Sequence, residues 1–346
     1  MKASISHFFN TFQHYFFNME LVVTTSLTPS ILAHIYASAG LTRNKQYHER
    51  FRYTLREEDV EFLETFAPHF RGTPPMAGGP MFLYLYQIPS YFPAESLDEV
   101  LGNIDRIVEG LGSGSIECMG LDQDTVSALD VWMPRQLFEY PSHNIVSELL
   151  EQITEILNRL KEVIAYSYDN YYSEHWRELK PLLLRRATEL KKEFEDLPVF
   201  NVWSEALGLT FPYRDFVVYL CEARRGGTSL LAEKIALPYD IPLEKAVDTI
   251  IHEVGIHFII RPGEYLKRGL TVEGFMQHQG EIGRMEEAAT CYFKPRVYER
   301  LGLTLKEDYH LPLMKIEDEI QRYAMVWERD EPADVFEGLL KACRLV

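Results

Sequence analysis

Apolar residues recur at helical spacing between residues 143 and 166, which predicts an amphipathic helix with one continuous hydrophobic stripe. The members of the stripe are Ile145, Val146, Leu149, Leu150, Ile153, Ile156, Leu157, Leu160, Val163 and Ile164. A second long helix is predicted over 174–196, where Lys, Arg and Glu separate the leucines. Such a stripe is more typical of a core than of a partner surface, although a helix pair of this length can also mediate a homodimer.

Shorter patterns predict further helices and a few strands on both sides of this pair. In chain order they are a strand at 20–25, helices at 29–38 and 57–70, a Gly/Pro-rich loop at 72–80, strands at 215–222 and 229–238, a helix from about 240 to 260, a loop from 261 to about 280, and helices at 281–293, 315–327 and 332–345. The fold class predicted is therefore α+β and predominantly helical.

Three regions are predicted from this order of elements. Residues 1–140 form an N-terminal mixed α/β region of unknown role, residues 141–196 the long helical pair, and residues 197–346 a C-terminal domain. Candidate chemistry is concentrated in the last of these regions.

The helix predicted from about residue 240 has clear start and stop signals. Asp240, Pro242 and Glu244 are typical of a helix start, and Arg261-Pro262-Gly263 of a stop. Its last two turns carry the sequence His252-Glu253-Val254-Gly255-Ile256-His257. This H-E-x-x-x-H pattern is one residue longer than the H-E-x-x-H helix of zinc proteases, in which two imidazoles hold zinc and the glutamate takes a proton from water.

The extra residue creates a geometric problem for a shared metal ion. Residues five positions apart on a regular helix differ by about 140° around its axis, so His252 and His257 do not converge. Two solutions are expected. A π-bulge near Gly255 restores the alignment, or the helix ends near Gly255 and His257 swings in from a loosened last turn. A buried helix with two incidental histidines remains the alternative interpretation.

A second acidic motif, Glu286-Glu287, follows on the helix predicted at 281–293, which is expected to stop before Pro295. Adjacent residues differ by about 100° around a helix, so only one of the two carboxylates can face a metal. The small residues after them favour close packing against a neighbouring helix. A solvated acidic face is the alternative interpretation of this pair.

The stretch from about Leu230 to Pro295, roughly a fifth of the chain, resembles the HExxxH-type zincins that include the microtubule-associated tyrosine carboxypeptidases and their bacterial relatives. That family carries a motif like H-E-I-G-T-H, followed by T-E-E-G-L-A. Here Ile256 replaces the Thr and Ala288 replaces the Gly.

The resemblance implies a zincin-like, gluzincin-type catalytic domain after the N-terminal regions. It also implies that His252, His257 and Glu287 are zinc ligands and that Glu253 is the general base. In zincins a strand beside the active-site helix forms the edge on which the peptide lies. The resemblance implies nothing about tubulin or tyrosine as a substrate.

Composition limits the partners. The formal net charge of −17 argues against nucleic acid and against docking on anionic membranes, because both require clusters of Lys and Arg. No stretch approaches the length of a membrane-spanning helix, and the N-terminus lacks signal-peptide features, so we expect a cytoplasmic protein. The four cysteines form no C-x-x-C motif, which gives no support for a cysteine zinc site.

Two functions are compatible with these patterns. The first is a zinc-dependent hydrolase, a metallopeptidase that acts on a peptide or protein through Glu253-activated, zinc-bound water. The second is a non-catalytic binding or regulatory protein with a structural or vestigial site. His278, Arg284, His310 and Tyr323 are accessory candidates: His278 as a ligand, Arg284 as a carboxylate clamp, and His310 or Tyr323 as the oxyanion donor.

Overall fold

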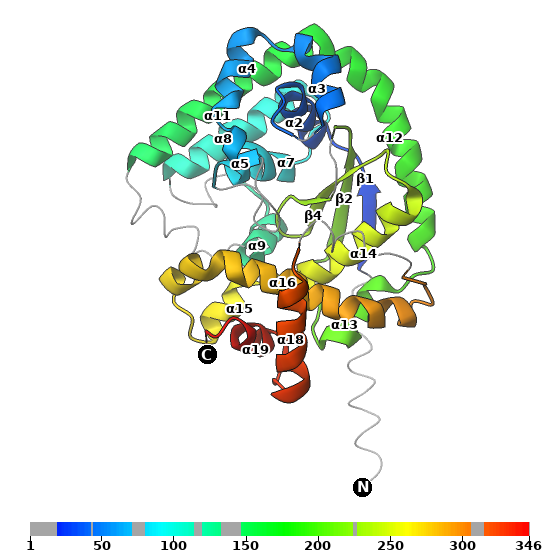
Figure 1. The fold of residues 1–346 in the computed structure, drawn as a ribbon. Coiled ribbons are helices and arrows are strands. Elements are labelled where there is room, and N and C mark those ends of the chain that lie inside the picture. Colours follow the sequence, from blue (N-terminus) through cyan, green and yellow to red (C-terminus); the bar gives the residue numbers. More distant parts are fainter. Residues whose placement is uncertain are drawn as a thin grey trace.

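A small sheet lies among many helices in the computed structural model, which describes residues 19–42, 44–70, 80–113, 120–132, 147–223, 227–305 and 315–345 (Figure 1). The N-terminal elements are β1 (Glu20–Thr24), α2 (Leu27–Ser38), α3 (Lys45–Phe51), the 3-10 helix η1 (Arg52–Thr54), α4 (Glu57–Glu64), α5 (Ala67–Phe70), α6 (Pro80–Phe82), the π-helix η2 (Leu83–Gln87), α7 (Ile88–Tyr91), α8 (Leu97–Ser113) and α9 (Gln123–Trp132). The remaining elements are α11 (Ser147–Ser167), the π-helix η4 (Tyr168–Tyr172), α12 (Ser173–Phe194), α13 (Val199–Leu207), β2 (Asp215–Cys221), β3 (Thr228–Ser229), β4 (Lys234–Pro238), α14 (Leu243–Ile259), α15 (Pro262–Lys267), α16 (Val272–Arg300), α18 (Glu317–Arg329) and α19 (Val335–Ala342).

The sheet has the order β1-β2-β4-β3. β1 pairs in parallel with β2, β2 pairs in parallel with β4, and β3 pairs antiparallel with β4. The chain is therefore predominantly helical with a small mixed sheet, which confirms the predicted α+β class. The division into three regions stays a prediction, but the sheet itself combines a strand from residues 20–24 with strands that follow residue 214.

The two long helices predicted around the apolar stripe are confirmed as α11 and α12. Figure 1 shows them as an arch over the rim of the molecule, joined without a break by η4. Ile153, Leu157, Leu160 and Ile164 of the stripe are buried in the core. In the described part of this stripe, the apolar face therefore packs within the chain.

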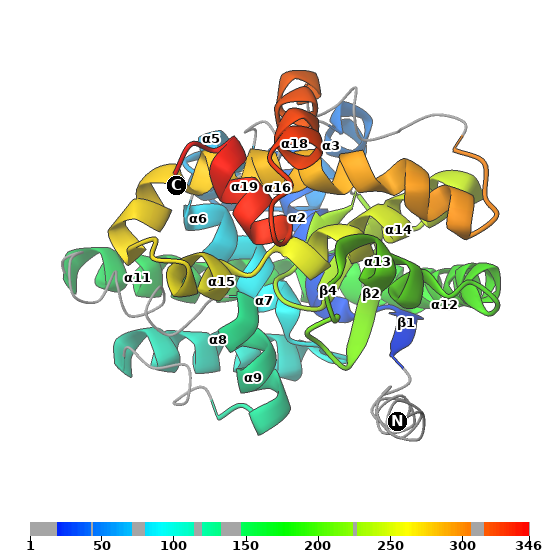
Figure 2. The same cartoon turned by 90° about the horizontal axis from the view of Figure 1, so that it is seen from below.

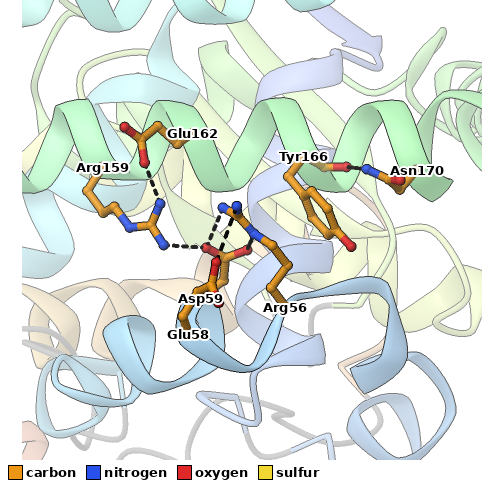
Figure 3. Close-up of polar contacts among 7 residues, drawn as sticks. All are labelled: Arg56, Glu58, Asp59, Arg159, Glu162, Tyr166 and Asn170. Carbon is orange, nitrogen blue, oxygen red and sulfur yellow. Dashed lines mark hydrogen bonds and ion pairs between the residues drawn. The ribbon is translucent and has the colours of Figure 1, made fainter.

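A buried carboxylate joins this arch to the N-terminal helices. Asp59 on α4 is fully buried and accepts hydrogen bonds from both Arg56 (2.8 and 2.9 Å) and Arg159 of α11 (2.7 Å) (Figure 3). Arg56 also lies over the ring of Tyr166. Charge-assisted hydrogen bonds of this kind compensate the cost of burying the carboxylate and fix α4 against α11.

The strand expected at 229–238 is a hairpin instead of one strand. Leu231 and Ala232 adopt positive φ angles of 83° and 43°, so the chain reverses between β3 and β4. Their side chains are buried, which holds this unfavourable backbone in place. β3 consequently becomes the edge of the sheet.

The loop expected between residues 261 and 280 is wrong, because α15 and the first turns of α16 occupy it. Thr271 caps α16 by accepting a hydrogen bond from the Gly274 amide. The helix also continues through Pro295 to Arg300. α13, α14, α18 and α19 pack against α16 (Figure 2), and this tertiary packing outweighs the local cost of a proline.

In the part of the chain that the structure describes, none of the helices combines the length and the apolar composition that spanning a bilayer requires.

Candidate functional site

The H-E-x-x-x-H motif lies in α14, which is α-helical from Leu243 through both histidines to Ile259. The expected π-bulge is therefore wrong, and so is the expected early end of the helix near Gly255. Asp240 is also not the capping residue, because Pro242 holds that position and no side chain caps the helix. His252 and His257 thus keep the angular offset of a regular helix.

Gly255 has a packing role within this regular helix. A Cβ atom at this position would lie 2.4 Å from the Trp203 ring, so only glycine leaves room for the indole. The indole nitrogen of Trp203 donates a hydrogen bond of 2.9 Å to the carbonyl of Ile251. The glycine therefore allows α13 to approach α14 closely, rather than allowing an irregular backbone.

His252 and Glu287 are in direct contact. The His252 Nε2 and Glu287 Oε2 atoms are 2.9 Å apart, and they join α14 to α16. One helical turn before His252, Asp248 forms an ion pair of 2.8 Å with Lys294, which lies two turns after Glu287. The two contacts fix the antiparallel register of α14 and α16, so Glu287 faces the helix that carries the two histidines.

His257 is oriented by the backbone of its own helix. Its Nδ1 lies 2.6 Å from the carbonyl oxygen of Glu253, so Nδ1 carries the proton and Nε2 keeps its lone pair. Nε2 lies 3.4 Å from Ser229 Oγ on the edge strand β3, and the ring packs edge-on against Phe216. Burial lowers the pKa of His257 to about 4, with a further lowering from the neighbouring His252.

Glu253 lies beside the start of the β3 segment. A Cβ atom on Gly227 would be 3.1 Å from Glu253 Oε1 and 2.8 Å from a methyl group of Thr249, so the absence of a side chain at Gly227 leaves room for the carboxylate. Burial, and after it the charge of Glu287, raises the pKa of Glu253 to about 8. A carboxyl group with such a pKa can both accept and donate a proton near neutral pH.

Glu286 points to a different partner from its neighbour. It accepts a hydrogen bond of 2.8 Å from the hydroxyl of Tyr265 on α15. The side chain therefore faces α15 instead of the histidines of α14. Burial raises the pKa of Glu286 to about 8, against the opposing hydrogen bond from Tyr265.

The side chains of His252, His257 and Glu287 are of the types that bind zinc. Their positions in this structure do not bring all three donor atoms to one ion. The 2.9 Å between His252 Nε2 and Glu287 Oε2 is near the roughly 3.4 Å that separates two ligand atoms around a tetrahedral zinc ion. The Nδ1 of His257 is hydrogen-bonded to a backbone carbonyl, which leaves Nε2 available to a metal ion. Metal-bound histidines commonly have this arrangement. However, no three His, Cys, Asp or Glu residues in the described part of the chain lie close enough to hold a metal ion. His257 must therefore move toward the other two for all three donors to share one ion.

The accessory candidates do not gather at this site. Arg284 binds Glu319 at 2.8 Å and the Lys315 carbonyl at 3.0 Å, which makes it a link to α18. His278 is partly exposed and lies 3.9 Å from Glu281. Tyr323 is fully buried among aromatic rings of α16 and α18. His310 falls outside the described residues.

Sequence reasoning missed several residues around the motif. Ser229, Gly227 and Tyr265 are separated from the helix residues they contact by loops whose path no local pattern specifies. Lys294 carried one usable signal, because a lysine among small and aromatic residues of a core helix requires a buried acidic partner.

A groove of about 1240 Å³ lies on the face of the sheet away from α14, and none of the motif residues lines it. Val217, Tyr219, Tyr213, Glu233 and Lys234 contribute to its wall. We assign the candidate site to the motif instead of to this groove, because His252 and Glu287 contact each other there and neither lines the groove.

Comparisons of the chain with protein-family models, with curated proteins and with solved structures give no match.

Proposed function

We propose that the protein is a zinc-dependent hydrolase of zincin type, and that it cleaves peptide bonds. The observation that carries the proposal is the 2.9 Å contact between His252 Nε2 and Glu287 Oε2, one residue from Glu253. The H-E-x-x-x-H pattern on α14 and the second acidic motif on α16 are therefore in contact. The antiparallel edge strand beside α14 supports the same proposal, because such an edge is where zincins hold their substrate.

Each residue has a separate role in this proposal. His252, His257 and Glu287 would hold the ion, which when bound lowers the pKa of a water molecule and polarises the scissile carbonyl. Glu253 removes a proton from the attacking water at its carboxylate and returns it to the leaving amine. The buried histidines keep bulk water away from one side of the site, while the partly exposed Glu287 marks its open side.

The variant Glu253→Gln tests the assignment. The amide keeps the size of the side chain but cannot take a proton, so zinc binding should persist while hydrolysis falls by at least about a hundredfold. The assay measures cleavage of a peptide library by the zinc-loaded protein, with zinc content determined in parallel. Equal cleavage by the variant and the wild type contradicts the role of Glu253.

A second candidate is a non-catalytic binding or regulatory protein in which these helices form only a structural site. It is favoured by the observation that no three donors in the described segments are already close enough to hold a metal. The two candidates differ in a simple measurement. A wild-type protein that holds no zinc at any loading and cleaves no peptide supports this second function.

A further inference from the structure

Gln87 reaches the candidate site from a distant part of the sequence. It is the last residue of the π-helix η2, and its Nε2 donates a hydrogen bond of 2.9 Å to the backbone carbonyl of Ser229. Ser229 is the residue whose hydroxyl lies beside His257 Nε2. π-helical turns are rare and occur often at functional sites, where they redirect a side chain.

The carbonyl that Gln87 occupies belongs to the outer edge of the sheet. In an antiparallel pair, consecutive residues point their backbone groups alternately toward and away from the partner strand. Leu230 donates its N–H to Lys234, so it faces β4, and the preceding Ser229 faces outward. Because β3 contains only Thr228 and Ser229, this carbonyl is the outward acceptor of the strand.

The same N-terminal segment holds the hairpin at a second point. The hydroxyl of Tyr91 donates to Glu233 at 3.0 Å, and Lys234 donates to the backbone carbonyl of Tyr91 at 3.2 Å. Lys234 Nζ also lies 3.8 Å from the centre of the Tyr91 ring. Residues 83–91 are therefore anchored on the hairpin, which keeps the Gln87 amide in its position.

We propose that Gln87 is a specificity-determining residue that closes the outer edge of β3 and restricts the site to the ends of peptide chains. An extended peptide that adds to an edge strand needs the outward backbone groups of that strand. The Gln87 amide takes the outward acceptor at Ser229, so a substrate strand must end there. This inference rests on the proposed function and adds that the enzyme is an exopeptidase.

The test compares the wild type with Gln87→Ala, both zinc-loaded, on a library of synthetic peptides whose products are identified by mass spectrometry. The wild type should remove residues from chain ends. Gln87→Ala should raise the ratio of internal to terminal cleavage by roughly two- to tenfold, the range that one net hydrogen bond supplies. Tyr91→Phe is the matched control, because it removes a contact of the same segment with the same hairpin but leaves the Ser229 carbonyl occupied.

An unchanged ratio in Gln87→Ala, or the same increase in Tyr91→Phe, overturns the inference and leaves the proposed hydrolase intact. If the wild type cleaves no peptide, the proposed function fails. The role of Gln87 is then tested by measuring which peptides the protein binds. Zinc-loaded Glu253→Gln, with and without Gln87→Ala, is used to capture peptides from the library. The captured peptides should be longer when Gln87 is removed, whereas equal lengths or no capture overturn the inference.

Discussion

Lys294 and Asp248 form a buried ion pair, with Nζ and Oδ1 2.8 Å apart, between the two helices that carry the candidate site. Tyr298 donates a further hydrogen bond to the same carboxylate oxygen. Lys294 is completely buried and the Asp248 side chain is only 5% exposed, so the pair is almost fully shielded from water. The ion pair lies beside the His252–Glu287 contact. The packing of α14 against α16 is therefore fixed both by this ion pair and by two residues of the proposed zinc site.

Removing one member of this ion pair should destabilise the fold strongly. We expect Lys294→Met to lower the free energy of unfolding by about 3–5 kcal/mol, because it leaves the Asp248 carboxylate buried without its cation. Urea denaturation measures the change. The double variant Asp248→Leu/Lys294→Met should regain most of the loss. A single variant within about 1 kcal/mol of the wild type would show that the pair is not buried in solution.

Gly255 should not tolerate even a methyl group. Its Cβ would lie 2.4 Å from the Trp203 ring, so Gly255→Ala should cost about 1–3 kcal/mol through overpacking, despite the higher helix propensity of alanine. The control is Gly280→Ala in α16, where a Cβ meets nothing within 4 Å. This second variant should gain about 0.5–1 kcal/mol. Thermal unfolding of both variants checks the opposite signs, and a loss in both would refute the packing argument.

His34 should make the fold sensitive to acid. It is buried between Tyr47 and Thr54, and burial together with the nearby His175 lowers its pKa from 6.5 to about 3. Above the ordinary value the ring is neutral in both states. Below that value only the unfolded chain takes up the proton, so stability falls as the pH drops from 6.5 toward 3.

The loss from His34 alone should approach about 3 kcal/mol near pH 4, at 1.36 kcal/mol per pH unit. His34→Gln keeps a polar side chain but has no such titration. Urea denaturation at neutral and acidic pH should therefore show a smaller loss for this variant than for the wild type. Equal losses would mean that His34 is accessible to protons in the folded state.

The sequence predicted elements where a local pattern is strong and failed where distant contacts decide. The stripe in α11 and the pattern of β2 need only their own residues to be recognised. The hairpin between β3 and β4 depends on buried residues with positive φ, which no alternation of side chains signals. The length of α16 depends on its packing partners instead of on Pro295.

The candidate site shows the same division. The spacing predicts that only one of Glu286 and Glu287 faces a given partner, and the two glutamates do have different partners. The regular course of α14 has no such local signal, because the residue that requires Gly255 is Trp203, which comes from another helix. Contacts between segments far apart in the chain, such as Gln87 with Ser229, carry no local signal at all.

The adjacent glutamates of α16 should differ in their effect on zinc. Glu287 contacts His252, whereas Glu286 bonds to Tyr265. We therefore expect Glu287→Gln to weaken zinc binding at least about tenfold, and Glu286→Gln to change it less. Titration against a competing chelator measures both affinities. The reverse order would transfer the ligand role to Glu286.

The most direct test of the account is the zinc content of the protein purified without chelator and dialysed against a low concentration of zinc. The account predicts one zinc ion per chain in the wild type, and none in the double variant His252→Ala/His257→Ala, which keeps its circular dichroism spectrum. Circular dichroism is needed to exclude unfolding as the cause of the loss. Full zinc occupancy in the folded double variant, or no zinc in the wild type, would contradict the metal site.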